Sequence, residues 1–498
     1  MNTHFFVANE LAALLAAPVA LLVSGLSAPA WKARILIFGQ VAAFCFAFLG
    51  LIWSLNFPSV ASPMAISKFA GLNLDTVSCG LLAGITFIAA VVLAFSDRYL
   101  LGDASRLSFL RLLTFLSSCA ALIGVTDSIC VSFVCWSALS LGLWVIMRLH
   151  CSRSGAAATV LRYHLLSDLA LLASLILVVG CTEATEFSEL SSASWLLSNG
   201  DSQWWAGTAA SLLMVIAFGV KSALFPFHRW LLVTLEAPTP LSGFLHAGVV
   251  NVSAILAWRL MPVLHEHSAI LLFWGIWSAF SAIVGTLSMS AQPDVKRKLV
   301  YSTAGQMGFM SLQCAVGAPG AAIFHLIAHG LFKCQMFLQS GSAVQEGSNI
   351  RKFGYSHGSE GESQRLRNSL LVAMTAIGFV CVYTSCIDFD WTSLSAAITA
   401  AALLCAVPAL NRINMSSLCL FWLTVMALGF ATGFGRRLFE LWMPADYSVN
   451  GWLLPAFLAM SLALALVLHL SRKSGIAKAL YVHSLNGFYV NELQLSRK

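Results

Sequence analysis

The stretch SLLMVIAFGVKSALFPFHRWLL, residues 211–232, decides how this chain folds. Its first half is apolar and belongs to a run long enough to cross the hydrocarbon core of a membrane. Lys221 interrupts that run, and Pro226 follows five positions later. Because proline removes a backbone donor and clashes with the preceding turn, the stretch predicts a membrane-spanning helix that carries a buried amine and breaks near Pro226.

The remainder of the chain has the same apolar character. Of its 498 residues, 59% are hydrophobic and 10% are charged, whereas soluble domains are about one quarter charged. We therefore expect one membrane domain and no soluble domain, in an all-α polytopic protein with about 14–15 transmembrane helices. The candidate spans are 9–26, 35–55, 76–96, 109–126, 128–147, 162–181, 207–225, 240–262, 268–290, 299–316, 320–340, 369–386, 392–410, 415–433 and 451–471.

Basic residues assign the two sides of the membrane. If the N-terminus lies outside, 22 of the 28 Lys and Arg residues fall in inside loops and four in outside loops, while Lys221 and Lys333 lie within spans. This asymmetry agrees with the positive-inside rule and predicts a cytoplasmic C-terminus. Residues 1–10 contain no basic region followed by a clear cleavage site, so we expect the first helix to be retained.

The polar segments divide the chain further. Residues 1–474 form the predicted membrane domain, in which 341–368 is a polar inside loop. The tail 475–498 is amphipathic with basic flanks, so it either lies along the inner membrane surface or docks a partner. The thirteen cysteines include no CxxC pair, and we expect them to be reduced, buried small side chains.

Ionisable side chains inside spans need a reason, because each is costly in the bilayer unless it is paired or hydrated. The predicted break at Pro226 would free backbone groups beside Lys221, and such groups line hydrated cavities. Burial disfavours the charged form of an amine, so Lys221 is a candidate to take up and release a proton. The alternative is a lysine that extends to the membrane interface.

A periodic set of ionisable residues lies in AAIFHLIAHGLFKCQMF, residues 321–337. His325, His329 and Lys333 are spaced i, i+4, i+8, which places them on one face of one helix. Stacked along a spanning helix, they form a candidate proton relay; the alternative is three core residues that are satisfied independently. We expect no metal site, because no carboxylate or cysteine is spaced to complete one.

A further candidate is His246, one span after Lys221. Pro238 and Pro240 open that span, at the helix start where proline is tolerated. A lone histidine in a helix is either a hydrogen-bonded packing residue or a channel residue. The position of His246 directly after the span of Lys221 favours the channel residue.

Asp168 is the candidate acidic residue, about one and a half turns inside the span 162–181. It would pair with Arg162 or His164 on its own helix, or with Lys221 on another helix. The alternative is a charge at the membrane interface.

Three stretches together resemble a known family. GVKSALFPFHRWLLVTLEAPTPLSGFLHAGVV (219–250), QPDVKRKLVYSTAGQMGFM (292–310) and AAIFHLIAHGLFKCQMFLQSGS (321–342) resemble the signatures of the proton-conducting membrane subunits of respiratory complex I and the Mrp-type cation antiporters. The resemblance covers residues 70–340. It implies an antiporter-like helical bundle with two inverted repeats, each containing a broken helix.

The resemblance also implies roles for individual residues. In the family, the ion or proton path runs through the central lysine of the first broken helix, the channel histidine after it, a central hydrophilic axis and an aspartate. The matching residues of this chain are Lys221, His246, His325, His329, Lys333 and Asp168.

The chain departs from the family pattern at three places. Pumping members carry a glutamate after the tryptophan of the fifth helix, whereas Trp136 is followed by Ser137 here. They also carry a lysine or glutamate in the broken helix of the second repeat, whereas 369–386 has no charge. The arginine usually found three residues before the aspartate is Leu165. An input carboxylate and an output residue are therefore missing, which favours a passive conduit harnessed by a partner.

One group within the family, the DabB subunits of bacterial inorganic-carbon accumulation systems, resembles this chain further, through WSALSLGL (136–143) and LYVHSLNGFYVNEL (480–493). The resemblance implies a cation-conducting subunit, for protons or Na⁺, in the bacterial inner membrane that energises uptake of CO₂ or bicarbonate. Its partner would be a large peripheral DabA-like zinc protein on the cytoplasmic face, forming a heterodimer. This chain would not be catalytic alone and would hold no cofactor, the zinc belonging to the partner.

Two other functions stay open at this point. One is a proton or cation antiporter, or a respiratory complex I or hydrogenase-type membrane subunit, of the same family. The other is a structural membrane anchor that conducts nothing, which the missing carboxylate at Ser137 and the uncharged segment 369–386 favour.

Overall fold

The computed structural model of the protein describes residues 2–26, 29–56, 71–151, 154–190, 201–341 and 475–489. Within these ranges every extended regular element is a helix, and nine helices are long and apolar enough to cross a membrane. The predicted class, an all-α polytopic membrane protein, is therefore confirmed. The predicted spans 369–386, 392–410, 415–433 and 451–471 lie outside the described residues.

The helices follow one another with short connections. Their bounds are α1 Asn2–Leu26, α2 Pro29–Asn56, α4 Thr76–Tyr99, α5 Arg106–Val125, α6 Ile129–His150, α7 Ser154–Thr182, α8 Phe187–Leu190, α9 Asp201–Lys221, α10 Arg229–Val233, η2 Thr234–Glu236, α11 Thr239–Ala247, η3 Val249–Asn251, α12 Val252–Arg259, α13 Met261–His265, α14 Ser268–Ala291, α15 Val295–Ala315, α16 Pro319–Leu338, α22 Gly475–Leu485 and η5 Gly487–Tyr489.

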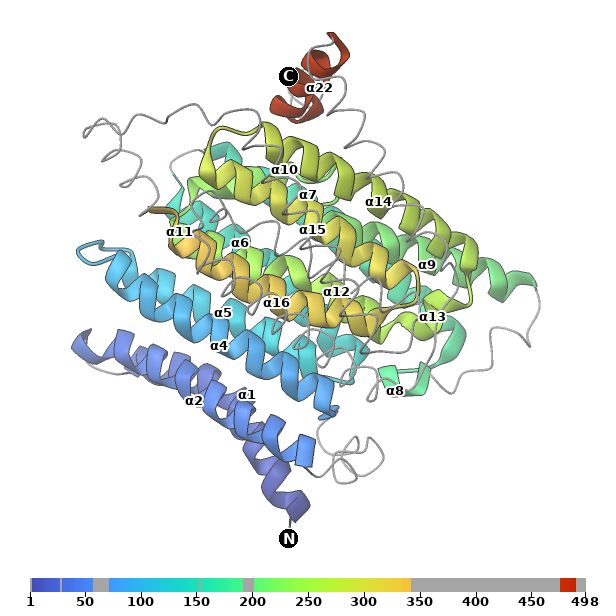
Figure 1. Ribbon diagram of the computed structural model, residues 1–498. Coiled ribbons are helices and arrows are strands. Elements are labelled where there is room, and N and C mark those ends of the chain that lie inside the picture. Colours follow the sequence, from blue (N-terminus) through green and yellow to red (C-terminus); the bar gives the residue numbers. More distant parts are fainter. Residues whose placement is uncertain are drawn as a thin grey trace, which may run out of the picture.

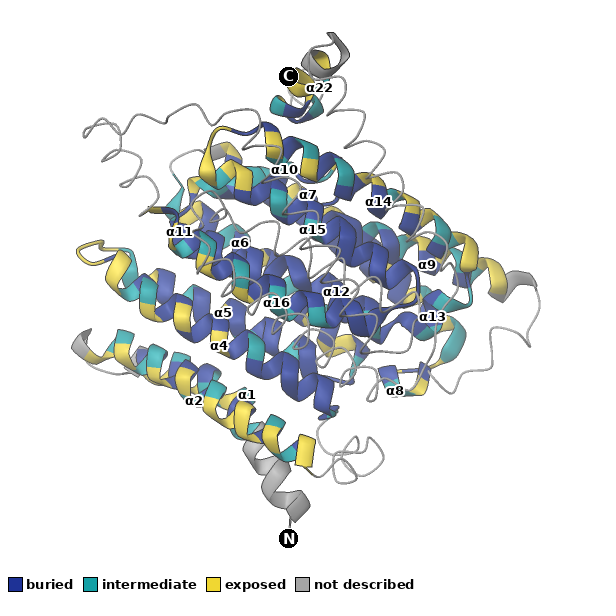
Figure 2. Ribbon diagram, viewed as in Figure 1, coloured by how far each residue is buried: buried dark blue, intermediate teal, exposed yellow. Residues whose placement is uncertain are grey.

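Neighbours in sequence pack as neighbours in space. The order α4, α5, α6, α7, α9, α14, α15, α16 runs around the bundle, and α11 and α16 pack back against α4. Figure 1 shows α1 and α2 as a pair at one edge, beside α4, with α14 and α15 at the other. Helices α12, α15 and α16 are largely buried, whereas α1 and α2 carry many exposed side chains (Figure 2). Of these buried helices, α16 holds three residues of the candidate path, His325, His329 and Lys333.

Two predicted spans, 9–26 and 299–316, lie on α1 and α15, which are not among the nine helices counted in the described residues. A third predicted span is interrupted in the structure. The span 240–262 corresponds to Thr239–Arg259, which counts as one of the nine, but within it α11 ends at Ala247 and a short 3-10 turn, η3, leads into α12. Gly248 adopts φ −125° and ψ −66°, outside the helical range. The side-chain amide of Asn251 donates to the Ala247 carbonyl at 2.8 Å, which satisfies a group that the break frees. The bundle thus contains a second interruption, directly after His246.

Small residues set the closest helix contacts. A Cβ at Gly285 would lie 2.5 Å from the backbone nitrogen of Gly305, and one at Gly308 would lie 2.6 Å from the nitrogen of Ala282. Side chains at these positions would therefore force α14 and α15 apart. Packing through small residues is how helices approach closely in a membrane, where apolar burial does not drive association.

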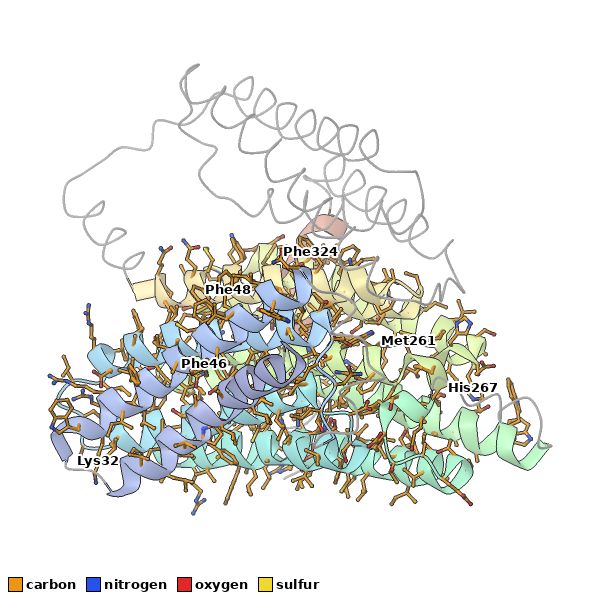
Figure 3. The ribbon with its side chains drawn as sticks, turned by 90° about the horizontal axis from the view of Figure 1, so that it is seen from below. Lys32, Phe46, Phe48, Met261, His267 and Phe324 are labelled. Carbon is orange, nitrogen blue, oxygen red and sulfur yellow. The ribbon has the colours of Figure 1, made fainter. Side chains whose placement is uncertain are left out.

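The two ends of the bundle can be told apart. Lys32 and His267 lie at opposite ends in Figure 3, as an alternating topology requires. The described part of the C-terminal tail packs on α14, and Gln292 at the end of α14 donates to the Leu485 carbonyl at 3.0 Å. Docking of a partner by the tail stays a prediction.

Candidate ion path

The helix that carries Lys221 ends at that residue. Helix α9 stops at Lys221, and the connection 222–228 that follows is not helical. Its backbone is held by α14, because Phe225 N–H donates to Ser281 Oγ at 2.9 Å and Trp277 Nε1–H donates to the Phe225 carbonyl at 2.6 Å. The freed groups of the break are thus bonded within the protein.

The break also favours the lysine charge. Lys221 is the last residue of α9, where the negative end of the helix macrodipole stabilises a cation. Trp230 of α10 donates its indole N–H to the Val220 carbonyl at 2.9 Å, which fixes the chain on both sides of Pro226. Helix α9 thus ends at Lys221, five residues before Pro226, the residue predicted to break it.

The ammonium group of Lys221 is fully bonded although the residue is completely buried. It donates to the Trp136 carbonyl at 3.0 Å, to Ser140 Oγ at 2.5 Å and to Asp168 Oδ1 at 3.3 Å. Its nitrogen also lies 4.5 Å from the centre of the Trp136 ring, within the range of a cation–π contact. Three acceptors match the three ammonium hydrogens, so this environment accepts the charged lysine.

Asp168 pairs with the lysine of another helix. Of the three partners considered from the sequence, Lys221 is the one within ion-pair distance, at 3.3 Å, and the aspartate side chain is 10% exposed. The Ser140 hydroxyl lies between the two charges, accepting from Lys221 and donating to Asp168 at 2.9 Å. Leu165, at the position of the family arginine, is 46% exposed and faces away from the pair.

His164 belongs to the same cluster. It is fully buried, and its Nδ1 lies 3.2 Å from Ser140 Oγ. Its ring packs edge-on against Trp230, with 4.6 Å between the ring centres. The sequence raised His164 only as a partner for Asp168 and did not raise Ser140 as part of the path. A signal was present, because each lies four residues, one helical turn, from a residue of the cluster.

A second cluster surrounds Lys333. This lysine is 1% exposed and donates to the Leu299 carbonyl at 3.3 Å. Within the described part of the chain no carboxylate lies within ion-pair distance of it. Its charge acts instead on two buried histidines, His246 and His329. Lys333 therefore lacks the compensation that Lys221 receives.

The histidines of this cluster are held by packing. His246 stacks on Phe337, with 4.3 Å between ring centres, and His329 meets His325 edge-on at 5.9 Å. Neither ring nitrogen of His246 or His329 has a hydrogen-bond partner among the described residues. A Cβ at Gly330 would lie 2.8 Å from the Ala247 carbonyl, so the glycine allows α16 to approach α11 closely.

His325 differs from its neighbours, because both of its ring nitrogens are bonded. Nδ1 lies 3.0 Å from the side-chain oxygen of Gln313, and Nε2 lies 2.8 Å from that of Gln306. An amide offers an oxygen or an NH₂ group depending on how it is turned. The two glutamines of α15 can therefore serve both protonation states of this histidine, and neither was raised from the sequence.

The predicted residues thus form two groups rather than one continuous line. Lys221 and Asp168 belong to the first group; His246, His325, His329 and Lys333 belong to the second. In the described ranges no hydrogen bond joins the two groups. Pro238 and Pro240 lie at the start of α11, between them in sequence. Within the same ranges no three His, Cys, Asp or Glu side chains gather as a metal site.

The connection 222–228 carries one more buried histidine, His228. His228 stacks on Phe225 with 5.5 Å between ring centres, and Tyr301 lies 5.7 Å from it. Both of its ring nitrogens lack a partner among the described residues, and burial lowers the pKa of His228 to about 4. Gly487 of the C-terminal segment lies against Tyr301 and His228, so this segment covers the connection.

Comparison with known proteins agrees with these motifs. The family described as NADH:quinone oxidoreductase/Mrp antiporter, transmembrane, matches residues 126–378. A protein of Bacillus subtilis described as a probable inorganic carbon transporter subunit DabB is 37% identical over 275 residues, 55% of this chain and 54% of that protein. The probable inorganic carbon transporter subunit DabB1 of Halothiobacillus neapolitanus is 34% identical over 286 residues, 56% of this chain and 51% of that protein.

Respiratory relatives and a solved structure are also similar. An NAD(P)H-quinone oxidoreductase subunit 5 of Paulinella chromatophora is 30% identical over 292 residues, 57% of this chain and 44% of that protein. The Mrp complex of a Dietzia species contains a chain with the same fold, at a TM-score of 0.60 and 21% identity, covering 98% of this chain and 60% of that one. This chain spans about half the length of the curated relatives that it matches.

Proposed function

Because this chain belongs to the NADH:quinone oxidoreductase/Mrp antiporter family of membrane proteins, we propose that it is a cation-conducting subunit that energises inorganic carbon uptake. The conducted ion is a proton or Na⁺. The path runs through Lys221 with Asp168 and then through His246, His329, Lys333 and His325.

One observation carries this proposal: two buried lysines are compensated to different degrees. The ammonium of Lys221 has three acceptors, one of them the carboxylate of Asp168. Among the described residues, Lys333 has a single carbonyl acceptor and two neighbouring histidines. A cation at the first lysine is therefore stable, whereas a cation at the second is costly. This difference in charge compensation between Lys221 and Lys333 favours a path along which a cation moves, rather than a pair of lysines that only holds helices together.

The relatives support the link to inorganic carbon. Those at 34% and 37% identity are described as probable inorganic carbon transporter subunits, and a subunit implies a partner. We infer a DabA-like zinc protein bound at the cytoplasmic face in a heterodimer, with the chemistry of CO₂ and bicarbonate, and the zinc, in that partner. The chain would lie in a bacterial inner membrane with its N-terminus outside.

A second candidate function rests on the respiratory relative. The protein at 30% identity is described as an NAD(P)H-quinone oxidoreductase subunit, and the fold is also that of a chain in an Mrp complex. A proton or cation antiporter, or a membrane subunit of a respiratory complex or hydrogenase, would use the same two lysines. The identity of the partner separates the two functions.

The test is complementation of a bacterial strain that cannot grow at atmospheric CO₂. We expect the chain, expressed with its partner, to restore growth, and Lys221→Ala to abolish it. Lys298→Ala is the matched control, because Lys298 lies exposed near the start of α15, and it should grow like the wild type. Growth of the Lys221→Ala strain would overturn the conduction proposal. Co-purification of respiratory or Mrp subunits, without a zinc protein, would favour the second candidate.

A further inference from the structure

The structure assigns His164 as a proton carrier that exchanges protons with Lys221 through the Ser140 hydroxyl. This inference rests on the proposed conduction through Lys221. It gives the cluster of Lys221, Ser140 and Asp168 a second group that can carry a proton. This cluster lacks the family glutamate, because Ser137 stands at that position.

The geometry of Ser140 is the first argument. Its Oγ lies 2.5 Å from Lys221 Nζ, 2.9 Å from Asp168 Oδ1 and 3.2 Å from His164 Nδ1. A hydroxyl can donate one hydrogen bond and accept two. The serine is therefore the shared atom through which the amine, the carboxylate and the imidazole are connected.

The burial of His164 is the second argument. The residue is fully buried, yet its Nε2 has no hydrogen-bond partner among the described residues. Leaving a buried polar atom unbonded is unfavourable, and an apolar ring would pack against Trp230 without that cost. A free Nε2 is what a proton carrier needs, because the ring must accept at one nitrogen and release at the other.

The charges around the serine are the third argument. Lys221 acts electrostatically on His164, and Asp168 is the carboxylate in contact with the cluster. One carboxylate compensates one cation, so a proton on Lys221 disfavours a proton on His164 and the reverse. The pair therefore shares a single proton.

The transfer balances without any other reactant. The Ser140 hydroxyl turns from Asp168 to His164 Nδ1, with the neutral ring carrying its hydrogen on Nε2. One N–H bond of the Lys221 ammonium breaks as its proton moves to Ser140 Oγ. The hydrogen of Ser140 moves to Nδ1 at the same time, leaving a neutral amine and an imidazolium, which then passes its Nε2 proton to a water molecule.

The positions along the helices give the step a direction. His164 is four residues closer than Asp168 to the start of α7. Four residues are about one turn of helix. Helix α7 begins next to the end of α6, so His164 lies nearer to that end of α7 than Asp168, the ion partner of Lys221, does. The predicted topology places this end inside.

The test compares two substitutions at one position in the complete complex. Asparagine can keep the hydrogen bond of Nδ1 to Ser140 but does not titrate, whereas alanine loses both. Proton flux into proteoliposomes should fall by at least about tenfold in both His164→Asn and His164→Ala, because a positioned proton donor contributes at least that factor. Wild-type flux in the folded His164→Asn protein would overturn the inference and leave a positioning residue.

A matched control and a separate variant make the outcome specific. His150 also lies 3.2 Å from a serine hydroxyl, that of Ser105, through Nδ1, but at the far end of α6. His150→Asn should conduct like the wild type. Lys221→Ala is measured in parallel: full flux there contradicts the proposed function, whereas loss there with full flux in His164→Asn contradicts only the role of His164.

Discussion

The ammonium nitrogen of Lys221 lies 3.3 Å from Oδ1 of Asp168, with the lysine side chain fully buried and the aspartate side chain 10% exposed. The pair joins α9 to α7, and the Ser140 hydroxyl of α6 bonds to both partners. The carboxylate that compensates the central lysine therefore comes from α7, whereas Ser137 stands at the expected position of α6.

Removing one partner of this pair should cost more than removing both. Asp168→Asn leaves the buried ammonium of Lys221 without a carboxylate. Lys221→Met leaves the carboxylate of Asp168 without an ammonium. Breaking a buried pair costs about 3–5 kcal/mol, whereas replacing both partners is often nearly neutral. Thermal unfolding of the purified protein should show both single variants less stable than the double variant. Additive losses in the double variant would contradict the pairing.

The position of Lys333 and His329 relative to His246 should depend on Gly330. Gly330→Ala places a Cβ 2.8 Å from the Ala247 carbonyl, so α16 must move away from α11. His329 and Lys333 then shift relative to His246, and cation flux should fall while the protein remains folded. Gly180→Ala is the control, because nothing lies within 4 Å of its Cβ. Equal flux in the two variants would show that this close approach does not matter for conduction.

Stability should fall in mild acid because of His228. Burial lowers its pKa to about 4 in the folded protein, while the pKa in the unfolded chain is near the ordinary histidine value of 6.5. Below pH 6.5 the unfolded chain binds a proton that the folded chain refuses, so stability is lost as pH falls from 6.5 towards 4. The shift corresponds to about 3 kcal/mol. The melting temperature of His228→Gln should fall less over this range; parallel curves would contradict the assignment.

Docking of the C-terminal segment 475–489 on the bundle should depend on Gly487. This residue has φ +58°, and a Cβ would overlap the Tyr301 hydroxyl. Gly487→Ala should therefore release 475–489 from the bundle and raise its hydrogen exchange. Gly102→Ala separates strain from overlap, because Gly102 also has a positive φ but open space around it. Unchanged exchange in Gly487→Ala would mean that the segment does not dock through this contact.

Local sequence patterns predicted the helices and one face of α16. The i, i+4, i+8 spacing placed His325, His329 and Lys333 together because helical periodicity is a property of one segment. The interruption after His246 was not predicted. Gly248 is the only local sign of it, and one glycine inside a spanning helix is ordinary.

Contacts between helices were harder to predict. Three partners were open for Asp168, and packing of α7 against α9 selects Lys221. Ser140 and His164 each lie one turn along their own helix from Trp136 and Asp168, but only the packing of α6, α7 and α9 brings them to the lysine. Gln306 and Gln313 on α15 bond to His325 for the same reason.

The central claim is that Lys221 carries the conducted cation. The most direct measurement is proton or Na⁺ uptake into proteoliposomes, driven by a membrane potential, with wild-type and Lys221→Met proteins incorporated equally. Methionine keeps the length of the side chain without its charge. The account predicts that uptake falls by at least about tenfold, because losing a positioned acid–base group typically costs more than that, while the helices remain folded. Undiminished uptake by the Lys221→Met protein would contradict it.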